Sequence, residues 1–114
     1  MKEMPIFTRT LDFITWLLPV TDNFPRSRRF TVTQRLCDAA LDFQELIIEA
    51  NNCRDQARMA KLRLADTALD KVRFYLRLAA RWKWLKPGQY GHAAEMVAEI
   101  GRLLGGWQKI TSGT

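Results

Sequence analysis

The spacing of apolar positions along the chain predicts helices throughout. Apolar residues recur every three or four positions, as on a helix with one buried face, and no stretch keeps the alternation typical of a strand. Short connectors between long helices make neighbours antiparallel, so residues 1–114 are expected to form one domain, an all-α, up-down four-helix bundle. The expected helices are Pro5 to Asp22, Thr31 to Cys53, Arg54 or Gln56 to Leu85, and Pro87 to Lys109.

The same spacing predicts which side of each helix faces the core. We expect Thr31 or Thr33 to cap the second helix and Pro19 to kink or shorten the first. The expected core residues are Phe7, Leu11, Ile14 and Leu18 in the first helix; Val32, Leu36, Ala39, Phe43, Ile47 and Ala50 in the second; Leu62, Ala65, Leu69, Val72, Leu76 and Ala79 in the third; and Tyr90, Ala93, Val97, Ile100, Leu104 and Trp107 in the fourth.

The first three helices carry more apolar surface than one core face uses. On the third helix, apolar side chains cover roughly two-thirds of the circumference, whereas a surface helix needs a stripe just over about 100° wide. Phe13 belongs to this surplus on the first helix. Because so much apolar surface is unfavourable in water, we expect subunit contacts, with wrapping inside the monomer as the alternative. The residues expected at the interface are Trp16, Leu41, Ile48, Phe74 and Leu78.

Positive charge collects in two places, within a formal net charge of +6. Pro25 ends the first helix by biasing Phe24 away from helical geometry, and Phe24 and Phe30 are expected to hold both ends of an arginine-rich connector. On the third helix, arginines at every fourth position repel one another, which an anionic partner would relieve. The candidate residues for binding nucleic acid or a protein partner are Arg26, Arg28, Arg29, Arg73, Arg77, Arg81, Lys83 and Lys86.

Each basic feature also has a simpler interpretation. The third-helix arginines can form a solvated ridge with Asp66 and Asp70 as local partners. Trp84 can be a platform for base stacking or a packing residue. Arg102 is a weaker binding candidate, because a cation near the end of a helix also complements the helix dipole.

The sequence shows no set of residues at the spacing that a catalytic or metal-binding site requires. Carboxylates on the second helix point outward and lack the Glu-x-x-His pair of a di-metal bundle site, and His92 lies on a polar face. Cys37 and Cys53 lie about 24 Å apart on one predicted helix, beyond disulfide reach and without a neighbouring base. We therefore expect no enzyme activity, metal or cofactor. The carboxylates concerned are Asp38, Asp42, Glu45 and Glu49.

Composition also bears on the compartment. The cysteine spacing favours a reducing, cytoplasmic location. No segment approaches the roughly 20 apolar residues of a membrane span, so no membrane association is expected. Gly101 and Gly105 form a Gly-x-x-x-Gly pattern, which indicates close approach of a neighbouring helix or helix termination.

A further pattern is an ordered set of short motifs spread over all four predicted helices. The set comprises Trp16–Pro19, Phe24–Thr31, Gln34-Arg35, Leu41-Asp42, Glu45–Asn51, Arg54-Asp55, Arg73, Arg77–Ala79, Gln89-Tyr90, His92-Ala93 and Glu99–Trp107. In this order they resemble the accessory variability determinant (Avd) proteins of diversity-generating retroelements. The chain departs from that pattern at Arg81–Trp84 and at Pro87-Gly88.

The resemblance implies an assembly and a function that the spacing alone does not give. It implies a barrel-like, pentameric ring of four-helix bundles, encoded by a bacterium or phage and lacking catalysis of its own. It further implies binding to RNA or DNA through basic surface. The ring would partner a reverse transcriptase that copies a template RNA with errors at adenines. Two alternatives stay open: a protein of a ribosomal-RNA intervening sequence, with the same fold, and a structural oligomer without nucleic-acid binding.

Overall fold

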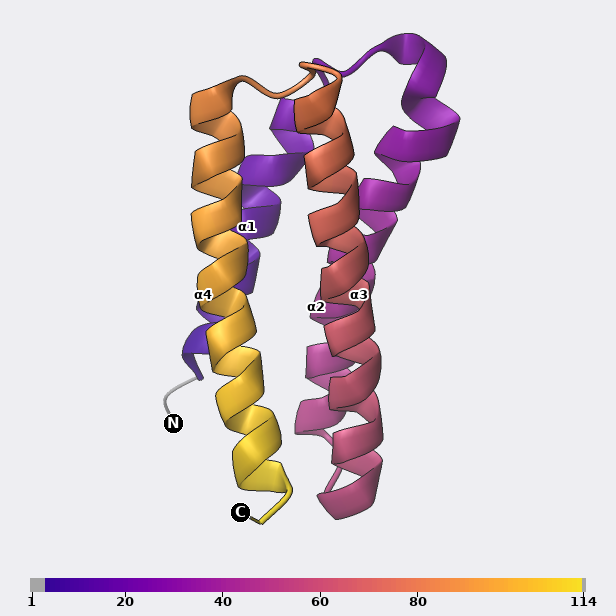
Figure 1. The fold of residues 1–114 in the computed structure, drawn as a ribbon. Coiled ribbons are helices and arrows are strands. Elements are labelled where there is room, and N and C mark those ends of the chain that lie inside the picture. The colour runs from indigo at the N-terminus through magenta and orange to yellow at the C-terminus, as the bar shows by residue number, and fades with distance from the viewer. Residues whose placement is uncertain (1–3, 114) are drawn as a thin grey trace.

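The computed structural model describes residues 4–113, and its helices form an antiparallel bundle (Figure 1). The four α-helices are α1 (Pro5–Thr21), α2 (Gln34–Asn51), α3 (Asp55–Arg81) and α4 (Pro87–Thr111). The α1–α2 and α3–α4 connectors lie at one end of the bundle, and the α2–α3 turn, the start of α1 and the end of α4 lie toward the other (Figure 1). The predicted all-α fold of four helices is therefore confirmed.

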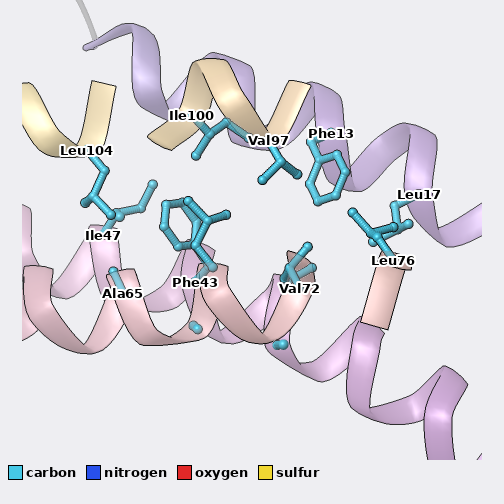
Figure 2. Packing of buried hydrophobic residues seen from close by; sticks show 14 of the residues in the cluster. Phe13, Leu17, Phe43, Ile47, Ala65, Val72, Leu76, Val97, Ile100 and Leu104 are labelled. Carbon is cyan, nitrogen blue, oxygen red and sulfur yellow. The ribbon is translucent and has the colours of Figure 1, made fainter. Parts of the chain in front are cut away.

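A continuous apolar core runs along the inside of the bundle, to which all four helices contribute (Figure 2). Every core residue predicted for α3 is buried, as are those of α2 from Leu36 onward. On α4 the prediction also holds, except that Tyr90 is only half-buried. A regular helical period is enough to locate these faces, because each of the three helices buries an almost purely apolar stripe.

The predicted core face of α1 is wrong in part. Leu11 is 62% exposed, whereas Phe13, assigned to the surplus, is 2% exposed and packs inside. The buried face of α1 includes Thr10, whose hydroxyl donates a 2.7 Å hydrogen bond to the carbonyl of Ile6 one turn earlier. Because that bond satisfies the hydroxyl inside the helix, a threonine occupies a core position that an apolar count assigns to the outside.

The segment between α1 and α2 is more helical than expected. α1 ends at Thr21, two residues after Pro19, and the chain then forms a 3₁₀ turn over Arg26–Arg28 and a π-helical turn over Arg29–Thr33. The expected cap of α2 is wrong, since no side chain caps its first turn, and the Thr31 hydroxyl bonds to the carbonyl of Arg28 at 3.3 Å. Extra turns of helix replace the cap.

α3 ends four residues earlier than predicted, at Arg81. Lys83 takes the left-handed conformation, with φ of 62°. The backbone N–H groups of Lys83 and Trp84 donate to the carbonyls of Ala80 and Ala79 at 3.0 and 2.8 Å. This is the Schellman arrangement that ends a helix, usually with glycine at the left-handed position. A lysine there gives no sequence signal for the end of a helix.

Candidate nucleic-acid interface

Basic residues are concentrated in the half of the bundle that holds the two connectors. Residues 23–37 and 71–94 contain ten of the 18 lysines and arginines and none of the 12 carboxylates. We call this region, which includes both connectors at one end in Figure 1, the basic end. The rest of the chain carries eight cations against twelve carboxylates. The basic end is thus much more positive than the net charge of +6 suggests.

The α1–α2 connector is anchored at one end only. Phe24 is buried and packs against Trp84, with ring centroids 5.5 Å apart. Phe30 is 80% exposed, so the expectation that aromatic residues hold both ends is wrong. Arg26, Arg28 and Arg29 are all exposed, as predicted. The connector therefore displays three guanidinium groups beside a fixed aromatic anchor.

The three arginines of the predicted ridge on α3 differ in exposure and in their partners. Arg77 and Arg81 are exposed, whereas Arg73 is half-buried and its Nη1 donates to Asp70 Oδ1 at 2.8 Å. The alternative interpretation, with an aspartate as local partner, therefore holds for Arg73. Its Nη2 also lies against Gly101 of α4, only 2.6 Å from where a Cβ on that residue would be.

Gly101 therefore makes room for a side chain rather than for a neighbouring helix. Beside it, a groove of about 700 Å³ runs between α3 and α4, with Arg73, Arg77 and Arg102 in its lining. Arg102 of α4 thus lines the same groove as Arg73 and Arg77 of the ridge. Its position near the end of a helix gives no indication that it lies beside these arginines. Gly105 has open space around its Cβ position, so the predicted close approach fails there.

The α3–α4 connector adds two exposed cations, Lys83 and Lys86, and a pair of tryptophans. Trp84 is half-buried between Phe24 and Trp82, which confirms that it is a packing residue. Trp82, by contrast, is 48% exposed and lies beside Arg28, whose guanidinium carbon is 5.8 Å from the ring centroid. The position of Trp82 was not predictable from the helical period, which places this residue on a continuing third helix, whereas α3 ends at Arg81.

A second hollow, of about 540 Å³, lies between the α1–α2 connector and the start of α2, with Arg26, Arg29 and Cys37 in its lining. Burial raises the pKa of the Cys37 thiol, an effect only partly offset by the Thr21 hydroxyl, whose oxygen lies 3.6 Å from the sulfur. A raised pKa keeps the thiol protonated at neutral pH and makes it a weak nucleophile. The hollow has no feature of a catalytic cysteine site.

The predicted interface residues do not all lie on open surface. Leu41, Ile48 and Phe74 are exposed. Leu78 and Trp16 are half-buried, and the Trp16 ring packs edge-on against His92 of α4 at 5.1 Å. Among residues 4–113, no group of three or more histidine, cysteine or acidic side chains is placed to hold a metal ion. No helix in the same range is long and apolar enough to cross a bilayer.

Fold and charge together define a small helical bundle with one strongly basic end. The sequence matches the bAvd-like family over residues 4–111, and the chain belongs to this family. The resemblance to Avd proteins is therefore confirmed. No curated protein sequence matches the chain.

A solved structure supports the fold independently of that family. It is a protein of unknown function from the S23 ribosomal protein family of Bacteroides thetaiotaomicron, similar with a TM-score of 0.82 and 19% identity. The similarity covers 91% of this chain and 95% of the other. At this identity the likeness shows a shared fold.

Proposed function

We propose that the protein is a non-catalytic, nucleic-acid-binding accessory protein of a diversity-generating retroelement. In this role it acts in the cytoplasm with a reverse transcriptase and template RNA during mutagenic cDNA synthesis. Membership of the bAvd-like family supports the retroelement role. The observation that carries nucleic-acid binding is the basic end, where ten cations occur without a carboxylate in residues 23–37 and 71–94. A field of this sign attracts phosphates and repels acidic surfaces.

The groove between α3 and α4 joins two arginines of the basic end, Arg73 and Arg77, with Arg102 and Asp70, which lie outside it. Asp70 and Gly101 hold the Arg73 guanidinium at the groove, so part of the entropy of ordering that side chain is already lost before binding. Arg77 and Arg102 line the same groove and add charge that phosphate oxygens would neutralise. Such contacts follow the backbone of a nucleic acid and carry no sequence information.

Assembly into a pentameric ring is part of the proposal. Exposed apolar residues on α2 and α3, including Leu41, Ile48 and Phe74, support subunit contacts. A ring would repeat the basic end five times and raise a weak contact by avidity. It could hold the enzyme and its template together and raise their effective concentration without chemistry of its own.

The experiment compares the wild-type protein with Arg73→Glu/Arg77→Glu, and with Arg54→Glu/Arg63→Glu as a control. Both double variants change the charge equally, but Arg54 and Arg63 are exposed cations outside the basic end. Affinity for the template RNA is measured over a salt series, and cDNA synthesis is reconstituted with the cognate reverse transcriptase. We expect wild-type affinity to fall steeply with salt, because binding releases condensed counterions. The groove variant should bind weakly and the control should resemble wild type.

Two results would contradict the proposal. A salt-independent affinity, or equal losses in both double variants, would remove the groove from nucleic-acid binding. Unchanged cDNA yield, priming site and adenine errors when the protein is omitted would remove the accessory role. That second result would favour the alternative of an intervening-sequence protein, which the fold shared with the S23 family member also allows.

A further inference from the structure

We propose that the exposed face of Trp82 stacks on an unpaired base of a single-stranded nucleic acid, with Arg28 beside it. This inference rests on the proposed nucleic-acid binding and names the form of nucleic acid and the place of contact. It concerns the stretch at which the chain departs from the Avd pattern, Arg81–Trp84. The juxtaposition that carries it is an arginine from the α1–α2 connector over a tryptophan that follows α3.

The Trp82 ring packs against a second tryptophan, which packs in turn on a buried phenylalanine. Its ring centroid lies 5.0 Å from that of Trp84, and Trp84 packs in turn on buried Phe24 at 5.5 Å. The left-handed turn at Lys83 lies between the two tryptophans in the chain. The ring of a tryptophan that is 48% exposed is thus packed against other rings without any ligand, so less ordering entropy remains to be lost when a base stacks.

The surface around Trp82 is open and positively charged. A shallow hollow of about 360 Å³ is lined by Pro25, Ser27, Arg28, Trp82 and Trp84. Its lining includes no acidic side chain, and Lys83 is exposed directly beside Trp82 in the chain. A base can therefore stack while its own phosphates meet cations. Arginine and tryptophan together suit the flat π-surface of any base, which gives binding without sequence preference.

The same surface fits other anionic partners less well. In a duplex, the faces of the bases are covered by their neighbours, so a tryptophan ring reaches them only after a base is extruded. An acidic protein surface would pair with Arg28 and Lys83 but would leave the exposed indole face without a matching group. Single-stranded nucleic acid uses both the cations and the ring, which is why we favour it over a duplex or an acidic protein.

The test measures binding of the full-length protein to an oligodeoxythymidine strand and to a mixed-sequence duplex of equal length. Trp82→Leu removes the ring but no charge. It should weaken strand binding by about tenfold and leave duplex binding unchanged. The salt dependence should also stay unchanged, since no phosphate contact is lost. Addition of the strand should quench wild-type tryptophan fluorescence, and that quenching should largely disappear in Trp82→Leu.

Two further variants control for effects on folding and on apolar surface in general. Phe30→Leu removes another exposed aromatic side chain from the basic end and should alter neither affinity. Trp82→Phe keeps an aromatic face and should retain most of the strand binding. Circular dichroism and native mass should match wild type for all three variants, because Trp82 and Phe30 are both substantially exposed.

The outcomes separate this inference from the function on which it rests. If wild type binds both probes and Trp82→Leu affects neither, or both equally, the stacking site is wrong while nucleic-acid binding stands. If wild type binds neither probe even at low salt, the proposed function fails as well. If Trp82→Leu binds the strand normally but loses the reverse transcriptase, the surface contacts protein and the inference is overturned.

Discussion

At the scale of single residues, Lys83 has a backbone conformation at which glycine would give a more stable protein. A side chain in the left-handed region brings its Cβ close to the backbone, at a cost of roughly 1–2 kcal/mol compared with glycine. Lys83 nevertheless has φ of 62° at the position where helices usually end in glycine. Unfavourable backbone geometry of this kind concentrates at functional sites. In the proposed stacking site, a cation beside Trp82 would be a functional reason for keeping lysine there.

Replacing this lysine is the first prediction. Lys83→Gly should raise the free energy of unfolding by about 1 kcal/mol, since glycine adopts the left-handed conformation without the Cβ clash. Lys83→Ala is the matched control, because it removes the same charge but keeps a Cβ at φ of 62° and should give no gain. Both are measured by denaturant unfolding. Equal stabilisation of the two variants would trace the gain to lost positive charge instead of backbone geometry.

At the scale of helices, α1 gives the sharpest difference between apolar pattern and packing. Phe13→Ala should lower the free energy of unfolding by about 3–5 kcal/mol, because Phe13 is 2% exposed and removing its ring leaves a cavity in the core. Leu11→Ala should change it by less than about 0.5 kcal/mol, since Leu11 is 62% exposed. Thermal and denaturant unfolding measure both. A larger loss for Leu11 would restore the face predicted from the sequence.

The same comparison explains how much of the fold the sequence can predict. The cores of α3 and α4 were predictable because their stripes contain almost only apolar residues at a regular period. The face of α1 was not, because Thr10 is buried and satisfies its hydroxyl on the Ile6 carbonyl. The end of α3 was not, because Lys83 stands where glycine would mark a stop.

The candidate site was predictable in composition but not in arrangement. The exposed arginines of the connector and of α3 can be found from charge and helical period. The contact of Arg73 with Gly101 and that of Arg28 with Trp82 join elements far apart in the chain. Such pairs depend on how the connectors close the end of the bundle, which no local pattern records.

At the scale of the whole molecule, the basic end and the exposed apolar surface of α2 lie in different parts of the chain. The basic end lacks carboxylates, and the remaining part of the chain holds all twelve of them against eight cations. Two exposed apolar residues of α2, Leu41 and Ile48, lie outside the basic end and supply a surface of a different kind. A subunit contact through these residues would leave the connectors of each copy free, so assembly and nucleic-acid binding can be tested separately.

The assembly itself is the last prediction. Native mass spectrometry should give a pentamer of the 13.2 kDa chain, as the resemblance to Avd proteins implies. The exposed apolar residues of α2 would then be buried in an obligate interface. Leu41→Glu should dissociate the pentamer, since a carboxylate in that interface would be buried without a partner. Helicity should persist, because Leu41 is 39% exposed within the monomer and lies outside its core.

Ile48→Glu, also exposed on α2, should likewise dissociate the oligomer. Ile110→Glu, at the far end of α4 and 78% exposed, should leave the oligomer intact. A wild-type monomer at micromolar concentration would rule out the ring and, with it, any gain in affinity from repeating the basic end.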